Sequence, residues 1–260
     1  MTATNNIIQI ATSRAKIKLA NSIKDYEEMA VGVKELVECQ PELNKDEFEW
    51  LSIAYTHCIK TRHVAWTEMK ITLDKEKESG NDEIISATET KLKEIESEML
   101  SYCADVLHLL EKKILPNINN NSLKVLCYKL MGDHNRFLAE LETSNAEYDE
   151  LHSFSAYQNG YELASRVLHI TCPEYLSLIL NYSQFVYEVL EEKEKAKDMV
   201  INVRNAVARQ AGIKEPSKDA LDILTLLNEN LLRWGVTEDV TETEDSPSST
   251  STNSNEEELS

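Results

Sequence analysis

The prolines of this chain mark the ends of its helical segments. Each of the five stands where an apolar helical repeat is interrupted, and a proline inside a helix costs about 3 kcal/mol. Only six glycines accompany them, whereas Leu, Glu, Lys and Ala are frequent, a balance typical of long helices. The sequence therefore predicts an all-α protein. The prolines are Pro41, Pro116, Pro173, Pro216 and Pro247.

The segments between these breaks predict nine helices. Two are much longer than the usual ~11 to 12 residues, and Gly80-Asn81 separates them. Long helices joined by short links pack antiparallel. Because the chain shows no self-similarity at a period of about 34 residues, a single bundle is favoured over a repeat array. The predicted helices span 6–20, 24–39, 45–79, 82–115, 122–142, 147–168, 173–192, 194–211 and 217–234.

Composition divides the chain into two parts. Over its 260 residues, 42% are apolar, which is enough for a sizeable core, and we predict one helical domain over residues 1–236. Residues 237–260 hold eight acids, no base and many hydroxyls. Such a segment cannot bury enough apolar surface to offset its ordering entropy. We expect a disordered acidic tail there.

The charge balance restricts the partners. Acidic side chains number 46 against 27 basic ones, for a net charge of -19, which repels phosphate backbones and anionic lipids. We therefore expect neither nucleic acid nor membrane as a partner. The N-terminal segment lacks the features of a signal peptide, and no stretch nears the roughly 18 apolar residues that span a bilayer. We expect a cytoplasmic location.

Signatures of catalysis and of metal binding are missing from the sequence. The six histidines form no HExxH motif and no Cys/His ladder, and we find no Gly-rich phosphate loop or nucleophile elbow. We predict a protein without enzymatic activity, metal or cofactor. The cysteines are odd in number and form no CxxC pair, so we expect buried reduced thiols. They are Cys39, Cys58, Cys103, Cys127 and Cys172.

Two cations share one face of the predicted helix 122–142. Lys129 and Arg136 are two helical turns apart, about 10 Å along the axis, so that together they could hold an anion. They could equally pair with the neighbouring acids Asp133 and Glu140.

Two asparagines, Asn181 and Asn230, lie on later helices beside apolar residues at helical spacing. An amide carries both a donor and an acceptor, so two asparagines on neighbouring helices could clamp the main chain of an extended peptide. The alternative is that each is exposed or bonded to its own helix.

Several sequence blocks, taken together, resemble the 14-3-3 family in order and spacing over about residues 15–236. The resemblance implies a cup-shaped bundle of nine antiparallel helices, usually dimeric, with an amphipathic groove for phosphoserine or phosphothreonine peptides. It also implies an adaptor role in signal transduction. The blocks are LSIAY at 51–55 with Trp66, DVLHLLEKKILP at 105–116, YKLMGDHNRFLAE at 128–140, LILNYSQFVYEVL at 178–190 and SKDALDILTLLNENLLRW at 217–234.

The resemblance also assigns the phosphate-binding positions. The family holds phosphate with a Lys and an Arg on its third helix and an Arg-Tyr pair on its fifth; the matching residues are Thr56, His63, Arg136 and Phe137. Only Arg136 is unchanged. A phosphoserine carries about -1.5 to -2 charges, so we expect weakened binding. Lys129 matches a groove lysine, and a protonated His63 would add a charge.

The peptide-binding positions agree better with the family. Asn181 and Asn230 match its two clamping asparagines, with Glu188 and Trp234 beside them. The matches to the apolar wall are Leu180, Ile223 and Leu226.

The segment KLANSIKDYEEMA at 18–30 resembles the dimer-forming first two helices of the family. Leu19, Ala20 and Ile95 match the apolar part of that interface. Four acids stand where the family pairs opposite charges, so we expect a homodimer or heterodimer that is weakened or rearranged. These acids are Asp25, Glu28, Glu94 and Glu98.

Three hypotheses follow. The chain is a divergent adaptor for phosphorylated protein segments, or a helical scaffold that binds unphosphorylated or acidic segments. The third places the chain's own tail in the groove, more so when the tail is phosphorylated near Ser246, because a tethered segment reaches a high effective concentration.

Overall fold

The computed structural model describes residues 3–141, 146–210 and 215–236. All regular elements in these ranges are helical, which confirms the predicted all-α class. The predicted tail and the predicted helix ends at 142 and 211 lie outside the described residues. The elements are α1 (Ala3–Ile23), α2 (Tyr26–Cys39), α3 (Lys45–Ser79), α4 (Asp82–His108), η1 (Leu109–Ile114), η2 (Leu115–Asn117), α5 (Asn121–Ala139), α6 (Ala146–Val167), α7 (Pro173–Glu188), α8 (Lys193–Arg209) and α9 (Lys218–Arg233).

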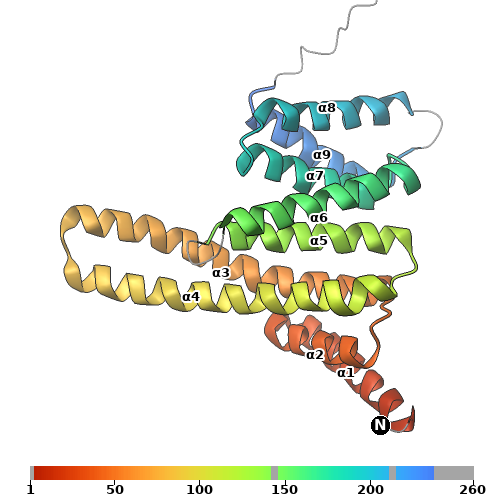
Figure 1. Ribbon diagram of the computed structural model, residues 1–260, viewed down its shortest axis with the longest axis horizontal. Helices are drawn as coiled ribbons and strands as arrows, with labels where there is room; N and C mark the ends of the chain where they lie inside the picture. Colours follow the sequence, from red (N-terminus) through yellow and green to blue (C-terminus); the bar gives the residue numbers. More distant parts are fainter. Residues whose placement is uncertain (1–2, 142–145, 211–214, 237–260) are drawn as a thin grey trace, which may run out of the picture.

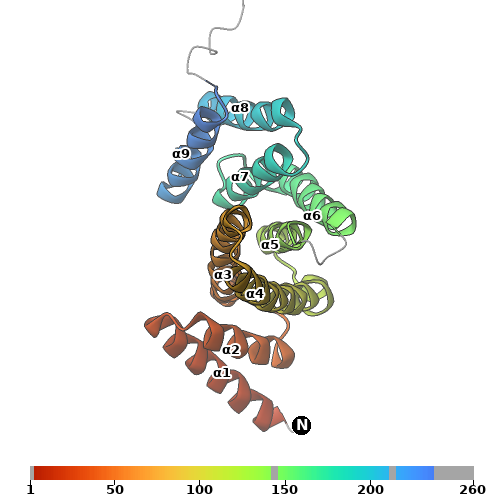
Figure 2. The ribbon, with the colours of Figure 1, turned by 90° about the vertical axis from the view of Figure 1, so that its left-hand side faces the viewer.

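The helices stack as successive antiparallel pairs. α1 packs on α2, α3 on α4, α5 on α6 and α7 on α8, and α9 packs against α7. Figure 1 shows the long α3–α4 pair projecting beyond the other helices. Seen from the side in Figure 2, α3 and α9 lie on the left of the stack and α6 lies on the right, with α5 and α7 between them.

Capping at both ends explains why α3 begins and ends where the sequence predicts. The Asn44 side chain accepts from the Glu47 backbone N–H, and the Glu47 carboxylate accepts from the Asn44 N–H, each at 3.0 Å. At the other end Gly80 adopts a φ of 75°, the left-handed conformation that glycine takes without strain. The pair of long helices is therefore defined by local signals.

Other helix ends differ from the prediction. α2 begins at Tyr26 instead of residue 24, because Lys24 has a φ of 60° and Asp25 caps the helix. α7 ends at Glu188 instead of residue 192, since Glu191 has a φ of 55°. The predicted helix 82–115 changes at Leu109 into a π-helical turn that buries three apolar side chains. α1 extends beyond its predicted range at both ends.

A close approach between α5 and α6 positions a tyrosine for the site described below. A Cβ atom on Gly132 would lie 2.7 Å from the ring of Tyr157, so only glycine fits there. The Ser153 hydroxyl donates to the Gly132 carbonyl at 2.9 Å and ties the two helices at the same point. Tyr157 is completely buried as a result.

The cysteine prediction is partly wrong. All five thiols are free, and Cys58, Cys103 and Cys127 are buried. Cys39 and Cys172 are only half-buried, because Cys39 is the last residue of α2 and Cys172 precedes the first turn of α7. No helix in the described part of the chain is both long and apolar enough to cross a bilayer.

Candidate functional site

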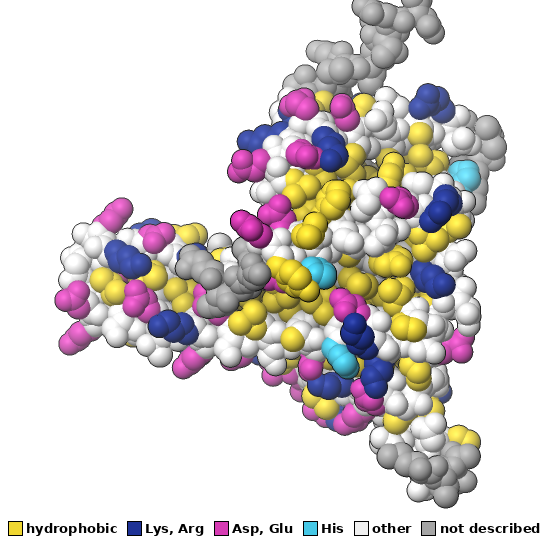
Figure 3. All heavy atoms as spheres, viewed as in Figure 1, with side chains coloured by type: hydrophobic (Ala, Val, Ile, Leu, Met, Phe, Trp, Pro, Cys, Tyr) yellow, Lys and Arg dark blue, Asp and Glu magenta, His cyan; other side chains and the backbone are white. Residues whose placement is uncertain are grey.

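The predicted binding residues come from four helices, α3, α5, α7 and α9. Thr56 and His63 belong to α3, and the predicted cations Lys129 and Arg136 to α5. α7 carries Leu180, Asn181 and Glu188, and α9 carries Ile223, Leu226 and Asn230, with Trp234 at its C-cap. In Figure 3, apolar side chains gather over the middle of the molecule, whereas charged side chains are spread over the projecting α3–α4 arm.

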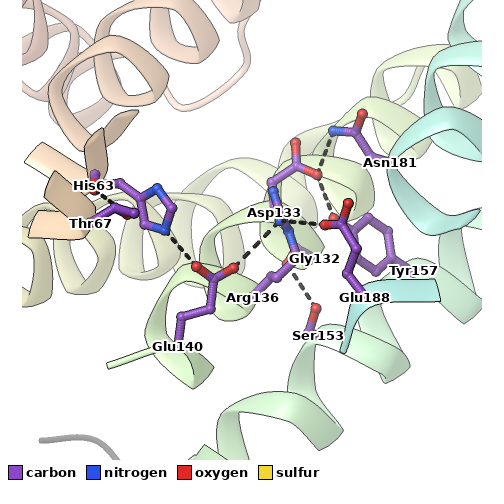
Figure 4. Close-up of polar contacts among 10 residues, drawn as sticks. All are labelled: His63, Thr67, Gly132, Asp133, Arg136, Glu140, Ser153, Tyr157, Asn181 and Glu188. Atoms are coloured by element: carbon purple, nitrogen blue, oxygen red, sulfur yellow. Dashed lines mark hydrogen bonds and ion pairs between the residues drawn. The ribbon is translucent and has the colours of Figure 1, made fainter. Parts of the chain in front are cut away.

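A buried carboxylate, Asp133, links a predicted cation to a predicted clamping residue. Its Oδ2 accepts from the Lys129 ammonium at 2.8 Å. Its Oδ1 accepts from the Tyr157 hydroxyl at 2.6 Å and from the Asn181 amide at 2.7 Å. Figure 4 shows the Tyr157 and Asn181 contacts converging on one oxygen. α5, α6 and α7 are thereby joined through one side chain.

The partners of Asp133 keep it ionised. Burial alone would raise the pKa of this carboxyl group. The charge of Lys129 and the hydrogen bonds from Lys129, Tyr157 and Asn181 outweigh burial and lower the pKa to about 2. Asp133 is therefore a permanent negative charge at physiological pH.

A second carboxylate, Glu140, lies between the predicted residues of α3 and α5. Its Oε2 is 2.5 Å from His63 Nε2, and its Oε1 is 3.5 Å from Arg136 Nη1. Glu188 of α7 approaches the same Arg136 nitrogen at 3.9 Å. His63 and Arg136 are thus brought together through an acid that occupies the space between them (Figure 4).

The cations of the site are therefore paired within the chain, which is the alternative that the sequence left open. Lys129 pairs with Asp133, and Arg136 pairs with Glu140. Including Glu188, three carboxylates face these two cations. An anionic ligand has to compete with them.

Two of the predicted phosphate-binding positions, Thr56 and Phe137, have different surroundings. Thr56 is half-buried on α3, two turns before His63. Phe137 is buried, with its ring centroid 5.2 Å from that of His63 and 5.1 Å from the guanidinium carbon of Arg136. Phe137 supports both side chains by packing and offers no hydroxyl to a ligand.

The α9 wall contains an unsatisfied amide. Asn230 is 3% exposed, and its Nδ2 makes no hydrogen bond. An unpaired buried donor costs about 1 to 3 kcal/mol. Trp234 is buried and stacks on Tyr187 at 4.5 Å, whereas Leu226 is exposed. Leu180 and Ile223 are half-buried.

A cavity of about 260 Å³ adjoins Lys129, between α3, α5 and α9. Apolar side chains of α3 and α5 form part of it, with Asp219 at the start of α9. The apolar members are Phe48, Leu126 and Leu130.

The predicted dimer residues fall into two groups. Leu19 is 66% exposed. Ile23, one turn further along α1, is 67% exposed and was missed by the sequence analysis. Ala20 and Ile95 are buried within the chain itself, which leaves little of them for a second copy. A spacing of four from Leu19 is the signal that would have identified Ile23.

Three of the four acids expected to repel across a dimer have cationic partners in the same chain. Glu28 lies 3.1 Å from Lys16, Glu94 lies 2.8 Å from Lys91, and Glu98 lies 2.5 Å from Arg62. Asp25 instead caps α2 by accepting from a backbone N–H.

Tyr157 and His134 are the other residues that the sequence analysis missed. Nothing in the sequence around Tyr157 indicates that it reaches Asp133, because the contact depends on how α6 packs on α5. His134 is buried with both ring nitrogens unpaired. Among the described residues, no group of three or more His, Cys, Asp or Glu is placed to hold a metal ion.

Comparison with known proteins gives a consistent result. A family model described as 14-3-3 protein matches residues 16–235. The chain is 33% identical over 222 residues to 14-3-3 protein epsilon of Drosophila melanogaster, covering 84% of this chain and 85% of that protein. It is also 33% identical over 225 residues to 14-3-3 protein I of Plasmodium falciparum, covering 84% and 86% of the two chains.

The buried His134 generates a prediction about acid stability. Burial, the largest effect, lowers its pKa from 6.5 to about 4. The unfolded chain therefore takes up this proton before the folded one, and stability is lost as the pH falls from about 6.5 to about 4, by up to about 3 kcal/mol. We expect His134→Leu to remove this loss in urea unfolding curves recorded between pH 7.5 and pH 4.5.

The matched control is His108→Leu, at an exposed position of α4. It should leave the pH dependence of unfolding as it is in the parent protein. A His134→Leu protein whose stability falls with pH as steeply as the parent's would contradict the assignment.

Proposed function

The chain belongs to the 14-3-3 family, and from this we propose that it is an adaptor that binds extended protein segments between α3, α5, α7 and α9, with weakened phosphate recognition. Family membership implies a phosphopeptide-binding adaptor without enzymatic activity. The expected partners are segments phosphorylated on serine or threonine.

The observation that carries the proposal is the complementary state of Asn181 and Asn230. Asn181 donates its amide to Asp133, and its carbonyl oxygen accepts no hydrogen bond from the described residues. Asn230 has an amide nitrogen without a partner. One residue therefore offers an acceptor for a ligand N–H, and the other offers a donor for a ligand C=O once its side chain turns outward. The two helices pack against each other.

The charge balance supports the weakened phosphate recognition. Lys129 and Arg136 already have carboxylate partners, and Glu140 lies between Arg136 and His63. A phosphate of about -1.5 to -2 charges meets repulsion from these acids as well as attraction from the cations. Thr56 supplies no charge. The contacts of Asn181 and Asn230 with the peptide main chain therefore contribute a larger share of the binding free energy than they would beside a pocket with four phosphate-binding side chains.

A second candidate function follows from the same balance. If the acids outweigh the cations, the groove binds unphosphorylated segments through the asparagine clamp. Measuring each peptide in a library with and without its phosphate separates the two functions, because equal affinities favour this second candidate.

We further propose a weak or rearranged dimer, either with a second copy or with a related chain. Leu19 and Ile23 supply exposed apolar surface. The nearby acids carry their own lysine or arginine partners, so they have less to gain from pairing across an interface.

We expect Thr56→Lys/His63→Arg to raise the affinity for phosphopeptides. Each new charge-assisted hydrogen bond contributes about 1.5 to 3 kcal/mol, so the gain should be at least about tenfold. Fluorescence anisotropy at fixed salt, with the unphosphorylated copy of each peptide alongside, measures it. The unphosphorylated copies should change little.

The matched control is Thr90→Lys/His108→Arg, which makes the same two replacements at exposed positions of α4. In the parent chain, Arg136→Glu should weaken phosphopeptide binding, whereas Arg166→Glu on the exposed surface of α6 should not. An equal gain in both double variants, or no loss in Arg136→Glu, would count against the phosphate site.

The acidic tail is proposed as an internal competitor for the groove. A chain ending at residue 236 should then bind external peptides more tightly than the full chain, because the tethered segment no longer competes. Equal affinities of the two chains in the same titration would exclude this role.

For the dimer, sedimentation velocity should show a reversible equilibrium that Leu19→Asp/Ile23→Asp shifts towards monomer, since two charges enter an apolar contact. The control Leu151→Asp/Val167→Asp alters exposed apolar residues of α6 and should have no effect. A tight nanomolar dimer of the parent chain with the family's usual shape would contradict the proposal.

A further inference from the structure

A second cavity lies away from the groove, between α2 and α4, and has a volume of about 830 Å³. None of the predicted peptide-binding residues lines it. Its walls come from α1, α2, α3 and α4, and half of its lining residues are acidic. The volume falls within the range of ligand sites, about 300 to 1,000 Å³. The acidic members are Asp25, Glu27, Glu28, Glu35, Glu38 and Asp105.

An unpartnered tyrosine forms part of the wall. Tyr55 is 1% exposed and lines the cavity. Its hydroxyl makes no hydrogen bond to any residue that the structure describes, so it is available to a ligand in the cavity. The ring packs edge-on against Tyr102 at 6.4 Å, and Ala30 and Val31 add apolar surface.

The acids at the rim outnumber the cations that pair with them. Glu28 and Glu35 share Lys16, and Asp105 pairs with Lys34. Arg62 binds Glu27, and Lys113 binds Glu38. Thus four cations pair with five of the six acids, Asp25 caps α2 instead, and Arg62 is also engaged by Glu98 outside the rim. The paired rim carboxylates stay accessible, with side chains between 44% and 63% exposed.

We propose that this cavity binds a short basic segment of a partner protein. Lysine or arginine side chains of that segment pair with the rim acids, and their methylene stems pack on Ala30, Val31 and the tyrosine rings. A polar group of the segment satisfies the Tyr55 hydroxyl. A single metal ion fits less well, because no group of three or more metal-ligating side chains occurs among the described residues.

The long-range field of the chain supports the same class of partner. A net charge of -19 attracts cationic segments and raises their rate of association. Diffuse attraction of this kind acts on the whole surface, so the test has to separate it from binding in the cavity. This second site is independent of the groove, and either can fail without the other.

The probe is fluorescein-labelled hexa-arginine, titrated by anisotropy at 150 mM salt in order to screen diffuse attraction, with labelled hexa-citrulline as the uncharged copy. Glu35→Gln/Glu38→Gln should weaken hexa-arginine binding by about 3- to 10-fold. The control Glu192→Gln/Glu194→Gln removes the same charge from two acids at the start of α8 that also have lysine partners. It should change the affinity less than about twofold.

Tyr55→Phe tests the hydroxyl that lines the cavity without changing the ring or the net charge. Loss of one hydrogen bond should weaken hexa-arginine binding by about 3- to 10-fold. Affinity of the groove for phosphopeptides should be the same in Glu35→Gln/Glu38→Gln as in the parent chain, which keeps the two sites distinguishable.

The proposal requires both effects. It is overturned if the two glutamate pairs weaken binding equally, if Tyr55→Phe binds like the parent, or if hexa-arginine binds no better than hexa-citrulline. Circular dichroism of each variant establishes that it is folded before the titration is read.

Discussion

The buried Asp133 carboxylate is the interaction on which the candidate site depends. An unpaired charge at this depth would cost several kcal/mol, and three partners from three helices prevent that. Lys129 lies on the same helix, Tyr157 comes from α6 and Asn181 from α7. Gly132 makes the arrangement possible, because only the absence of a Cβ lets the Tyr157 ring approach α5. Packing and charge therefore specify one geometry together.

The same pairing limits what the site can bind. A groove that binds a phosphate dianion needs cations that are not already paired with carboxylates. Here Lys129 and Arg136 face Asp133 and Glu140. The substitution of family cations by Thr56 and His63 increases that imbalance. The proposed reduction in phosphate recognition therefore rests on a local change in charge, while the proposed main-chain partners Asn181 and Asn230 are present on α7 and α9.

The pairing of charges also differs between the predicted groove and the cavity between α2 and α4. Around the predicted groove the cations are half-buried, and each is held by one or two acids. Around the α2–α4 cavity the acids are exposed and outnumber their cations. The proposed peptide groove and the acidic cavity are therefore chemically different surfaces, and we propose a different class of protein segment for each.

The sequence by itself determined the helices and the family. Prolines, the Asn44 cap and Gly80 act through neighbouring backbone, so their effect is readable from local order. It also supplied the candidate residues, some because helical spacing places them on common faces and the others through the resemblance to the family. Tertiary packing alone decided their state. It placed Glu140 between His63 and Arg136, brought Tyr157 to Asp133, buried Ala20 and Ile95 within the chain, and left the Asn230 amide nitrogen without a partner. These contacts join residues far apart in the chain, and their energies depend on burial and on distances between helices, which no local pattern encodes.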